Sequence, residues 1–351
     1  MKLKAGVIGC GKIAQRLHLP QYEGCGKVEI AAVCDWDKNL AQQMADQYGV
    51  KNVYTNHNDL LNNKDIDVVS VCIPNYEHCE VVKAAAEAKK HVLCEKPIAM
   101  SLKEASEMIE ACEKNKVLFM VEQTQRFDPN HEVAKEVLED GMLGKILSVW
   151  ARIGHAGPEY WNPDAADWKG GTAWYVTKEQ SGGGALIDVG IHIYDLVRWL
   201  MGEEVVEISG RTATLVKPFK VEDHGIAHLK FESGAIGGFG VSWNTRPYQV
   251  ILFFYGEKGT MKVEFGANPP VMVNFGNPTH VGDPNCGWGS CTPNGRDQSR
   301  RGGPIAYFMD CIIKGEKPFI SGEQGRKSLE GLMGVYKSME TGQVVKFPMK
   351  E

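Results

Sequence analysis

The sequence predicts an α/β protein with two domains. Residues 1–122 are expected to form a doubly wound parallel sheet, and residues 123–351 an α+β domain with a largely antiparallel sheet. The chain has 351 residues, which at about 150 residues per domain gives about two domains. Strand and helix patterns alternate in the first third, whereas later strands follow one another without helices between them.

The first third contains short, almost continuously apolar runs, as expected for parallel strands that are covered on both faces. These predicted strands are Leu3–Ile8, Val28–Cys34, Val68–Ile73, His91–Cys94 and Val117–Val121. Apolar positions at helical spacing lie between them, in Lys38–Tyr48, Glu77–Lys89 and Leu102–Asn115. Such alternation is typical of βαβ units and of an open, doubly wound sheet.

The remainder begins with a predicted helix, Asn130–Glu139, and then changes to strands separated by glycine-containing turns. The predicted strands are Ile146–Ile153, Val205–Thr214, Ile226–Phe231, Ala235–Trp243, Gln249–Tyr255 and Thr260–Phe265. Consecutive strands favour antiparallel pairing. The segment Asn268–Gly303 is rich in Gly, Pro and Asn and predicts a long loop. Helices Ile305–Lys314 and Gln324–Ser338 are predicted near the end.

Charge and hydropathy argue against two classes of partner. The chain has 39 basic and 44 acidic side chains and a net charge of −5, so it lacks the basic surplus that neutralises nucleic-acid phosphates. The longest apolar runs, such as Val250–Tyr255, have strand length and are too short to cross a bilayer. We therefore expect neither nucleic acid nor a membrane as a partner.

The beginning of the chain and its cysteines predict a compartment. The apolar part of Leu3–Cys10 spans about six residues, which is shorter than the core of a secretory signal, and we interpret it as a strand. The 10 cysteines are scattered, and several lie in apolar runs where a thiol behaves as a small buried hydrophobe. These observations predict a reducing, cytoplasmic location.

A glycine-rich turn follows the first predicted strand. Gly9-Cys10-Gly11-Lys12-Ile13-Ala14 has the G-x-G-x-x-A form of the dinucleotide-binding motif. Gly9 permits a tight turn, Gly11 lets the backbone approach a pyrophosphate, and Ala14 lets the next helix pack closely. Because N–H groups at the start of that helix favour phosphate, the predicted cofactor contacts are Gly9, Gly11, Lys12 and Ile13.

An acidic residue marks the end of the second predicted strand. Asp35 lies 24 residues after Gly11, close to the spacing of roughly 20 for the carboxylate that binds the adenosine ribose. A carboxylate there accepts both ribose hydroxyls and repels a 2′-phosphate, so Asp35 predicts NAD rather than NADP, although Lys38 is nearby. The alternative interpretation of Asp35 is a turn residue at a strand end.

A lysine follows the predicted strand His91–Cys94. Because strand carboxyl ends border the ligand crevice of such a sheet, Lys96 of Glu95-Lys96-Pro97 is predicted to face the reactive end of the cofactor. Its ammonium group can stabilise the negative charge that develops on a hydroxyl oxygen as hydride leaves. Pro97 is able to hold the preceding peptide bond in cis.

The second domain carries a carboxylate and an imidazole at helical spacing. Ser181-Gly182-Gly183-Gly184 precedes a helical pattern in which Asp188 and His192 are four residues apart and therefore lie on one face. Such a pair can bind adjacent hydroxyls of a polyol, with His192 taking a proton as hydride departs. The alternative is an ordinary polar pair within a helix.

Taken together, these blocks resemble one known family. Gly9–Ala14, Glu95-Lys96-Pro97, Arg126-Phe127 and Gly183–His192 resemble, in order and spacing, the Gfo/Idh/MocA family of glucose–fructose oxidoreductase and inositol dehydrogenase. The resemblance spans nearly the whole chain. It implies a Rossmann domain, an open-faced second sheet that is often used for dimer or tetramer contacts, and sugar or cyclitol substrates.

The resemblance also implies roles for individual residues. Lys96, Asp188 and His192 match the family's catalytic trio. Pro74, Asn75 and His78 look like the segment that passes the nicotinamide ribose, and with Glu95 and Lys96 they complete the predicted cofactor contacts. The trio and Arg126 are also predicted substrate contacts. Two more are predicted from their place in an aromatic stretch just before the Asp188 block, His155 and Trp168.

Two segments are not explained by the resemblance. His155–Lys178 is crowded with aromatic residues, which either meet the C–H face of a sugar or anchor a loop. Cys286 and Cys291 have His280 nearby, but no second pair of ligands follows, so we predict no metal. His18 has no local partner and is assigned to packing or the surface.

The predicted activity is an NAD-dependent oxidoreductase that transfers hydride between nicotinamide and a secondary hydroxyl of a sugar, glycoside or cyclitol. One alternative retains NAD and uses transient oxidation to cleave a glycosidic bond, and consumption of free NAD separates the two. Another is a non-catalytic NAD-binding regulator. The expected partners are a small sugar or cyclitol substrate and further copies of the chain, as a homodimer or homotetramer.

Overall fold

The computed structural model describes residues 2–161, 170–276, 287–291 and 302–349, and the chain divides into two compact units. Unit 1 comprises Met1–Thr124, Glu179–Gly182 and Asp297–Leu329, and unit 2 comprises Gln125–Lys178, Gly183–Arg296 and Glu330–Glu351. The sequence predicts a single boundary at residue 122. The structure instead assigns two later segments to unit 1, and one of them bonds to its last strand: Val121 N–H donates to Ile320 O.

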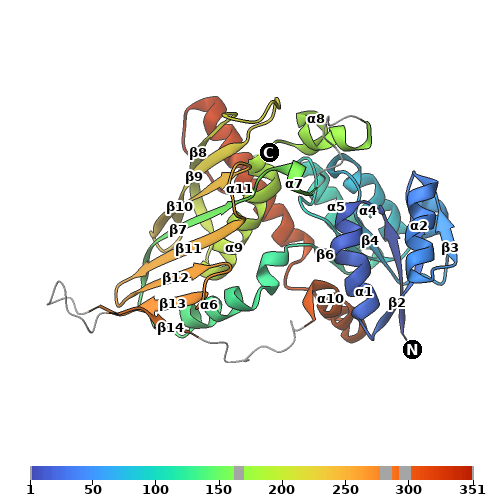
Figure 1. The fold of residues 1–351 in the computed structure, drawn as a ribbon, viewed down its shortest axis with the longest axis horizontal. Helices are drawn as coiled ribbons and strands as arrows, with labels where there is room; N and C mark the ends of the chain where they lie inside the picture. Colours follow the sequence, from blue (N-terminus) through green and yellow to red (C-terminus); the bar gives the residue numbers. More distant parts are fainter. Residues whose placement is uncertain (1, 162–169, 277–286, 292–301, 350–351) are drawn as a thin grey trace. The chain divides into compact units, whose positions relative to one another are not determined.

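Unit 1 is built on a parallel sheet (Figure 1). Among the described residues this sheet has six strands in the order β3-β2-β1-β4-β5-β6. The strands are β1 Leu3–Ile8, β2 Val28–Cys34, β3 Asn52–Tyr54, β4 Val68–Val71, β5 His91–Cys94 and β6 Phe119–Val121. The order reverses between β1 and β4, and ligands bind beyond the carboxyl ends of strands at such a reversal. The sequence prediction missed β3, because three residues with none of them buried show no period.

The helices of unit 1 cover this sheet: α2 packs on β2 and β3, and α4 packs on β4, β5 and α5. The helical segments are η1 Ala14–His18, α1 Leu19–Gly24, α2 Lys38–Tyr48, α3 His57–Leu61, η2 Asn75–Glu77, α4 His78–Glu87, α5 Leu102–Asn115 and α10 Gly303–Lys314. Helix α2 has the predicted bounds because Asp37 accepts the N–H of Asn39 and Gly49 ends the helix at φ 66°.

Unit 2 is built on a second sheet, in which the described residues form nine strands in the order β14-β13-β12-β11-β7-β10-β9-β8-β15. All neighbours are antiparallel except β10 and β7. The strands are β7 Ile146–Gly154, β8 Val205–Ala213, β9 His224–Phe231, β10 Ile236–Ser242, β11 Gln249–Gly256, β12 Thr260–Glu264, β13 Val271–Asn274, β14 Gly289–Ser290 and β15 Val345–Lys346. The prediction of one long loop over 268–303 is wrong where β13 and β14 form.

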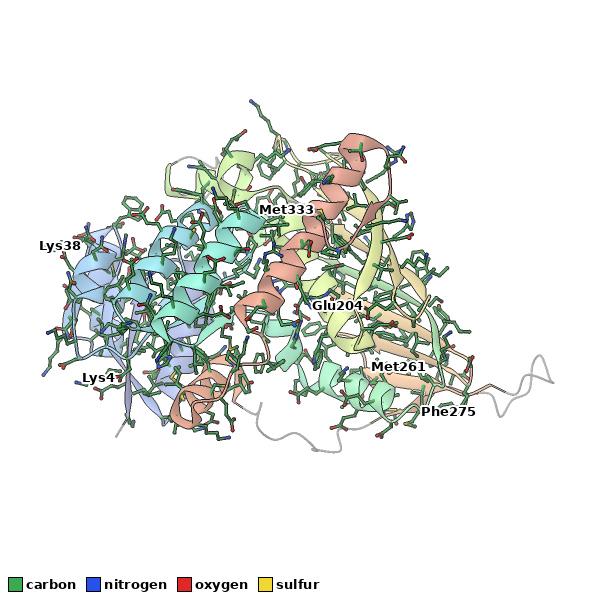
Figure 2. The ribbon with its side chains drawn as sticks, turned by 180° about the vertical axis from the view of Figure 1, so that it is seen from behind. Lys4, Lys38, Glu204, Met261, Phe275 and Met333 are labelled. Atoms are coloured by element: carbon green, nitrogen blue, oxygen red, sulfur yellow. The ribbon has the colours of Figure 1, made fainter. Side chains whose placement is uncertain are left out.

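Burial alternates along these strands, so one face of the sheet forms the core and the other stays open. On β9 every second residue is buried. Met261 of β12 is fully buried, whereas Phe275, just after β13, is 46% exposed (Figure 2). Helices α6 and α9 contact each other, with α9 against β7 and α6 against β12 and β13. The predicted fold class is confirmed.

The remaining helical segments join the units or belong to unit 2. They are η3 Thr124–Phe127, α6 Pro129–Glu139, α7 Pro158–Trp161, η4 Gly170–Val176, α8 Lys178–Ser181, η5 Leu186–Gly190, α9 Ile191–Met201 and α11 Gly322–Thr341. Segments η1 and η5 are π-helical, a form that often occurs at functional sites. In the part of the chain that the structure describes, no helix is both long and apolar enough to span a bilayer.

Candidate active site

The dinucleotide motif forms a tight turn at the carboxyl end of β1. Gly9 has φ +92°, and a Cβ there would lie 2.3 Å from Cys72 O, so only glycine fits. At Gly11 an added Cβ would meet no atom within 4 Å, which leaves its backbone open to approach. Ala14 is fully buried. The three small residues therefore have the packing that a dinucleotide-binding turn requires.

Asp35 sits beside this turn, directly after β2. It is 8% exposed, and its Oδ2 accepts the N–H of Cys10 at 2.7 Å while its Oδ1 accepts the N–H of Asp37 at 2.9 Å. Each carboxylate oxygen has two acceptor positions, so these bonds leave room for ribose hydroxyls. The open backbone at Gly11 and this fixed carboxylate fit a dinucleotide.

The segment after β4 carries three predicted cofactor contacts. Asn75 donates its side-chain N–H to Ser181 O at 2.8 Å. The fully buried ring of His78 lies 2.9 Å from Pro97 O through Nδ1 and 3.0 Å from Ile73 O through Nε2. The predicted cofactor contact of His78 is therefore not supported, because its ring joins the segments after β4 and β5. For Pro74 and Asn75 the contact stays a prediction.

Lys96 follows β5 within the Glu-Lys-Pro block. The Lys96–Pro97 bond is cis, and the Lys96 side chain is half-buried. Glu95 is 6% exposed, and its Oε2 accepts the N–H of Lys96 at 3.2 Å. Its Oε1 lies 2.9 Å from His18 Nε2. The predicted cofactor contact of Glu95 is not supported, since its carboxylate faces inward.

His18 belongs to a buried polar cluster that sequence reasoning missed. Its Nδ1 lies 3.0 Å from Ser70 Oγ, which is 2.8 Å from the Tyr22 hydroxyl. Burial opposes the charge on His18, but Cys72 and Glu95 outweigh it and hold the pKa of His18 well above its usual value. No local signal reveals this cluster, because Glu95 is 77 residues further along the chain.

In unit 2, three donors surround the carboxylate of Asp188. Tyr175 donates its hydroxyl to Oδ1 at 2.5 Å, and Trp243 donates its indole N–H to Oδ2 at 2.9 Å. His155 Nε2 lies 3.2 Å from Oδ2. Because the N–H of Gly157 donates to His155 Nδ1, we assign the proton to Nε2, which then donates to Asp188. Asp188 is 9% exposed and is held as an acceptor.

His192 lies four residues after Asp188, in one uninterrupted helical segment. Asp188 belongs to the π-helical η5, and the half-buried His192 is the second residue of α9. The structure thus keeps the predicted helical context of both residues, while it gives the Asp188 carboxylate partners in three other segments. The catalytic roles of Lys96, Asp188 and His192 remain predictions.

The other predicted substrate contacts are Arg126, His155 and Trp168, and their outcomes differ. Arg126 is 3% exposed, and its guanidinium makes two bonds of 2.7 Å to the fully buried Asp195. A substrate contact for Arg126 is not supported, because this group holds helix α9 to η3. His155 is 2% exposed and its Nε2 lies 3.2 Å from Asp188 Oδ2, so its substrate contact stays a prediction. Trp168 lies outside the described residues.

Trp243 and Tyr175 contact Asp188 and were not predicted as site residues. Their rings stack with centroids 6.2 Å apart and planes 28° apart. Tyr175 belongs to the aromatic stretch that the sequence analysis singled out, so its composition was a usable signal. Trp243 follows β10 without any motif, and only the fold brings it to Asp188.

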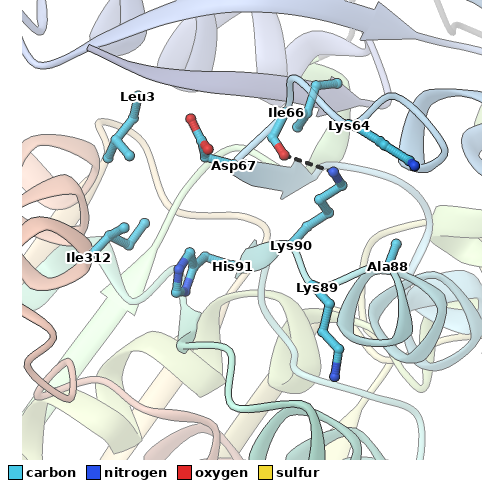
Figure 3. A pocket seen from close by; sticks show the side chains of 9 residues that line it. All are labelled: Leu3, Lys64, Ile66, Asp67, Ala88, Lys89, Lys90, His91 and Ile312. Carbon is cyan, nitrogen blue, oxygen red and sulfur yellow. Dashed lines mark hydrogen bonds between the residues drawn. The ribbon is translucent and has the colours of Figure 1, made fainter. Parts of the chain in front are cut away.

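A hollow in unit 1 lies at the opposite end of the parallel sheet from the glycine-rich turn at Gly9. It is lined by residues at the amino ends of β1, β4 and β5, among them Leu3, Asp67 and His91 (Figure 3). Lys90 is 5% exposed there, and its ammonium donates to Asn63 O and Ile66 O at 2.8 Å. The ammonium group of Lys90 therefore serves to satisfy two backbone carbonyl groups.

Within the described part of the chain, no three His, Cys, Asp or Glu side chains are grouped as metal ligands. Cys291 is half-buried. Cys286 and His280 lie outside the described residues.

Known protein families match both units of the chain. A model described as an oxidoreductase family with an NAD-binding Rossmann fold matches residues 3–123. A model of the GFO/IDH/MocA C-terminal domain matches residues 131–262.

Individual proteins are similar over most of the chain. The uncharacterized oxidoreductase YrbE of Bacillus subtilis is 34% identical over 283 residues, covering 78% of this chain and 77% of its own. Myo-inositol 2-dehydrogenase of Thermotoga maritima is 29% identical over 371 residues, covering 98% of both. The crystal structure of the WlbA dehydrogenase of Bordetella pertussis, in complex with NADH and UDP-GlcNAcA, has a TM-score of 0.82 at 26% identity and covers 99% of both chains.

Proposed function

The chain belongs to the Gfo/Idh/MocA family of NAD-binding oxidoreductases, and from this premise we propose that it oxidises a secondary hydroxyl of a sugar, glycoside or cyclitol. The relative named myo-inositol 2-dehydrogenase, 29% identical over almost the whole chain, supports this substrate class. Asp35 supports NAD rather than NADP, because its buried carboxylate lies where a 2′-phosphate would be repelled.

One observation carries the proposal: three donors bind the carboxylate of Asp188. Asp188 and His192 lie in the same helical segment. NAD, when bound, supplies the acceptor for the hydride. Three donors favour the charged form of a carboxylate. A negative charge four residues before His192 favours the imidazolium that forms when His192 takes the hydroxyl proton.

Lys96 supplies the complementary charge. In the oxidative direction its ammonium donates to the reacting oxygen and stabilises the negative charge that builds on it. The Glu95 carboxylate accepts the backbone N–H of Lys96 and so fixes the Lys96 backbone. In the reverse direction His192 returns the proton to the oxygen of the carbonyl compound. These roles are part of the proposal, and kinetics of single variants test them.

The decisive variant is His192→Ala. General acid–base catalysis contributes about 10²–10⁴-fold, so we expect kcat to fall by such a factor while the Kd for NAD stays unchanged. Monosaccharides, inositols and glycosides are assayed by NADH absorbance, with His57→Ala in α3 as the matched control. An unchanged kcat in His192→Ala would remove this residue from the mechanism, and glycoside cleavage without net NADH would favour the retained-NAD alternative.

We also propose that copies of the chain associate through the open face of the second sheet, as a homodimer or homotetramer. Large apolar side chains gather there: Trp150 is 50% exposed on β7, Ile226 is 54% exposed on β9 and Ile236 is 61% exposed on β10. An apolar patch of this kind marks an interaction surface. Sedimentation velocity measures the mass in solution.

We further propose a cytoplasmic location. Nine described cysteines are free thiols, and unpaired cysteines in this number are typical of reducing compartments.

A further inference from the structure

The glycine-rich turn that leads to Asp188 is held by one carboxylate. Glu222, between β8 and β9, accepts the N–H of Gly184 at 2.8 Å and the N–H of Leu186 at 3.1 Å with its Oε1. Its backbone oxygen accepts the N–H of Ala185 at 2.8 Å. Glu222 therefore binds three consecutive N–H groups at the start of the helical segment that contains Asp188 and His192.

The glycines of the turn are what allow this contact. A Cβ at Gly184 would lie 2.0 Å from the backbone oxygen of Glu222, and one at Gly183 would lie 2.0 Å from the Tyr336 hydroxyl. Tyr336, on α11, donates this hydroxyl to Glu222 Oε1 at 2.7 Å. Burial and the neighbouring Glu222 raise the pKa of Tyr336 well above its usual value, so the phenol stays a donor.

Short chains of hydrogen bonds connect Glu222 and Asp223 to the backbone and to the side chain of Asp188. The N–H of Asp188 donates to Gly184 O at 2.9 Å. The backbone of Asp188 is therefore bonded to Gly184, whose own N–H donates to Glu222. The next residue, Asp223, accepts the N–H of Trp243 with its backbone oxygen at 2.8 Å, and the Trp243 indole donates to Asp188 Oδ2. The backbone of Asp188 and one of its side-chain donors are thus fixed by neighbouring residues.

We propose that Glu222 is a positioning residue for Asp188 and His192, acting through the Gly184–Leu186 turn. It touches neither substrate nor cofactor in this scheme, and the inference rests on the proposed function only in assigning catalysis to Asp188 and His192. Without its carboxylate, two N–H groups at the start of η5 lose their acceptor and the segment shifts. Because a displacement of about 1 Å can cost about 10²-fold in rate, the expected effect is on kcat.

The test compares three variants of the full chain. Glu222→Ala removes the acceptor, Glu222→Gln keeps an oxygen that can accept, and Glu203→Ala is the matched control. Glu203 also binds a turn, accepting the N–H and hydroxyl of Ser233 at 2.7 and 2.8 Å. We expect kcat to fall about 10²-fold in Glu222→Ala and to recover most of its value in Glu222→Gln. The KM for NAD stays unchanged in both.

A spectroscopic readout separates this proposal from the proposed function. The indole ¹⁵N–¹H signal of Trp243, assigned by its loss in Trp243→Phe, reports the bond to Asp188 without any substrate. We expect it to shift in Glu222→Ala and to stay in place in Glu203→Ala. A folded Glu222→Ala with wild-type kcat and an unmoved Trp243 signal would overturn the positioning role. If the wild type turns over no sugar, a shifted signal still supports the positioning role and only the proposed function fails.

Discussion

Buried carboxyl groups in the two units differ in how many hydrogen-bond donors they have. In unit 2, Asp188 has three donors, and the fully buried Asp223 accepts the N–H groups of Leu215, Val216 and Lys217. In unit 1, Glu122 is 1% exposed, and its Oε2 has no hydrogen-bond partner among the described residues.

The contrast shows that donors, rather than depth, decide the charge of a buried carboxyl. Burial alone would raise the pKa of Asp223, yet His224 and the three backbone N–H groups hold it well below its usual value. For Glu122, burial raises the pKa to about 8, with His18 opposing the shift and Glu95 adding to it. The donors thus hold Asp223 as a negative charge, whereas burial favours the protonated form of Glu122.

The largest expected effect comes from breaking the ion pair of Arg126. Arg126→Met leaves the buried Asp195 without its two guanidinium bonds, and such an unpaired charge costs about 3–5 kcal/mol of unfolding free energy. Urea unfolding measures this loss. Arg198→Met, on helix α9 like Asp195, is the control. Its partner Glu204 is partly exposed, with 38% of its side-chain surface accessible, so the loss should be smaller. Unchanged stability with weaker substrate binding would restore the substrate contact predicted from sequence.

A smaller effect is expected at the dinucleotide turn. Asp35→Ala removes the acceptor for Cys10 N–H and for the ribose hydroxyls, and a hydrogen bond to a charged group is worth about 1.5 kcal/mol. The Kd for NAD, measured by calorimetry, should rise about tenfold. Asp37→Ala, which removes the cap of α2, should lower stability without this change. Wild-type NAD affinity in Asp35→Ala would leave Asp35 as a turn residue.

The smallest effect concerns the protonation of Glu122. Because its native pKa of about 8 lies above the ordinary value of 4.5, the native state binds the extra proton, and stability falls as pH rises from 4.5 to 8. Glu122→Gln should therefore raise Tm by about 2 °C or more at pH 8.5 relative to wild type, with a smaller gain at pH 5. The exposed Glu29→Gln on β2 is the control. The same gain at both pH values would contradict a protonated Glu122.

Most elements of the fold were predictable because each shows a local period. The bounds of β1, β2, β5, α2 and α5 match the sequence prediction. What failed was short or nonlocal: β3 and β14 have too few residues to show a pattern, and the return of 297–329 to unit 1 depends on the contact of Ile320 with Val121.

The sequence by itself determined the parts of the site that lie within one stretch of chain: the turn from Gly9 to Ala14, the Glu-Lys-Pro block, and the spacing of Asp188 and His192. These depend on the geometry of one turn or one helix, which nearby residues specify. Only the tertiary structure decided what each side chain bonds to. It paired Arg126 with Asp195, Glu95 with His18 and Trp243 with Asp188. The reason is physical: a buried charge must find donors, and the fold brings those donors from strands and helices tens of residues away.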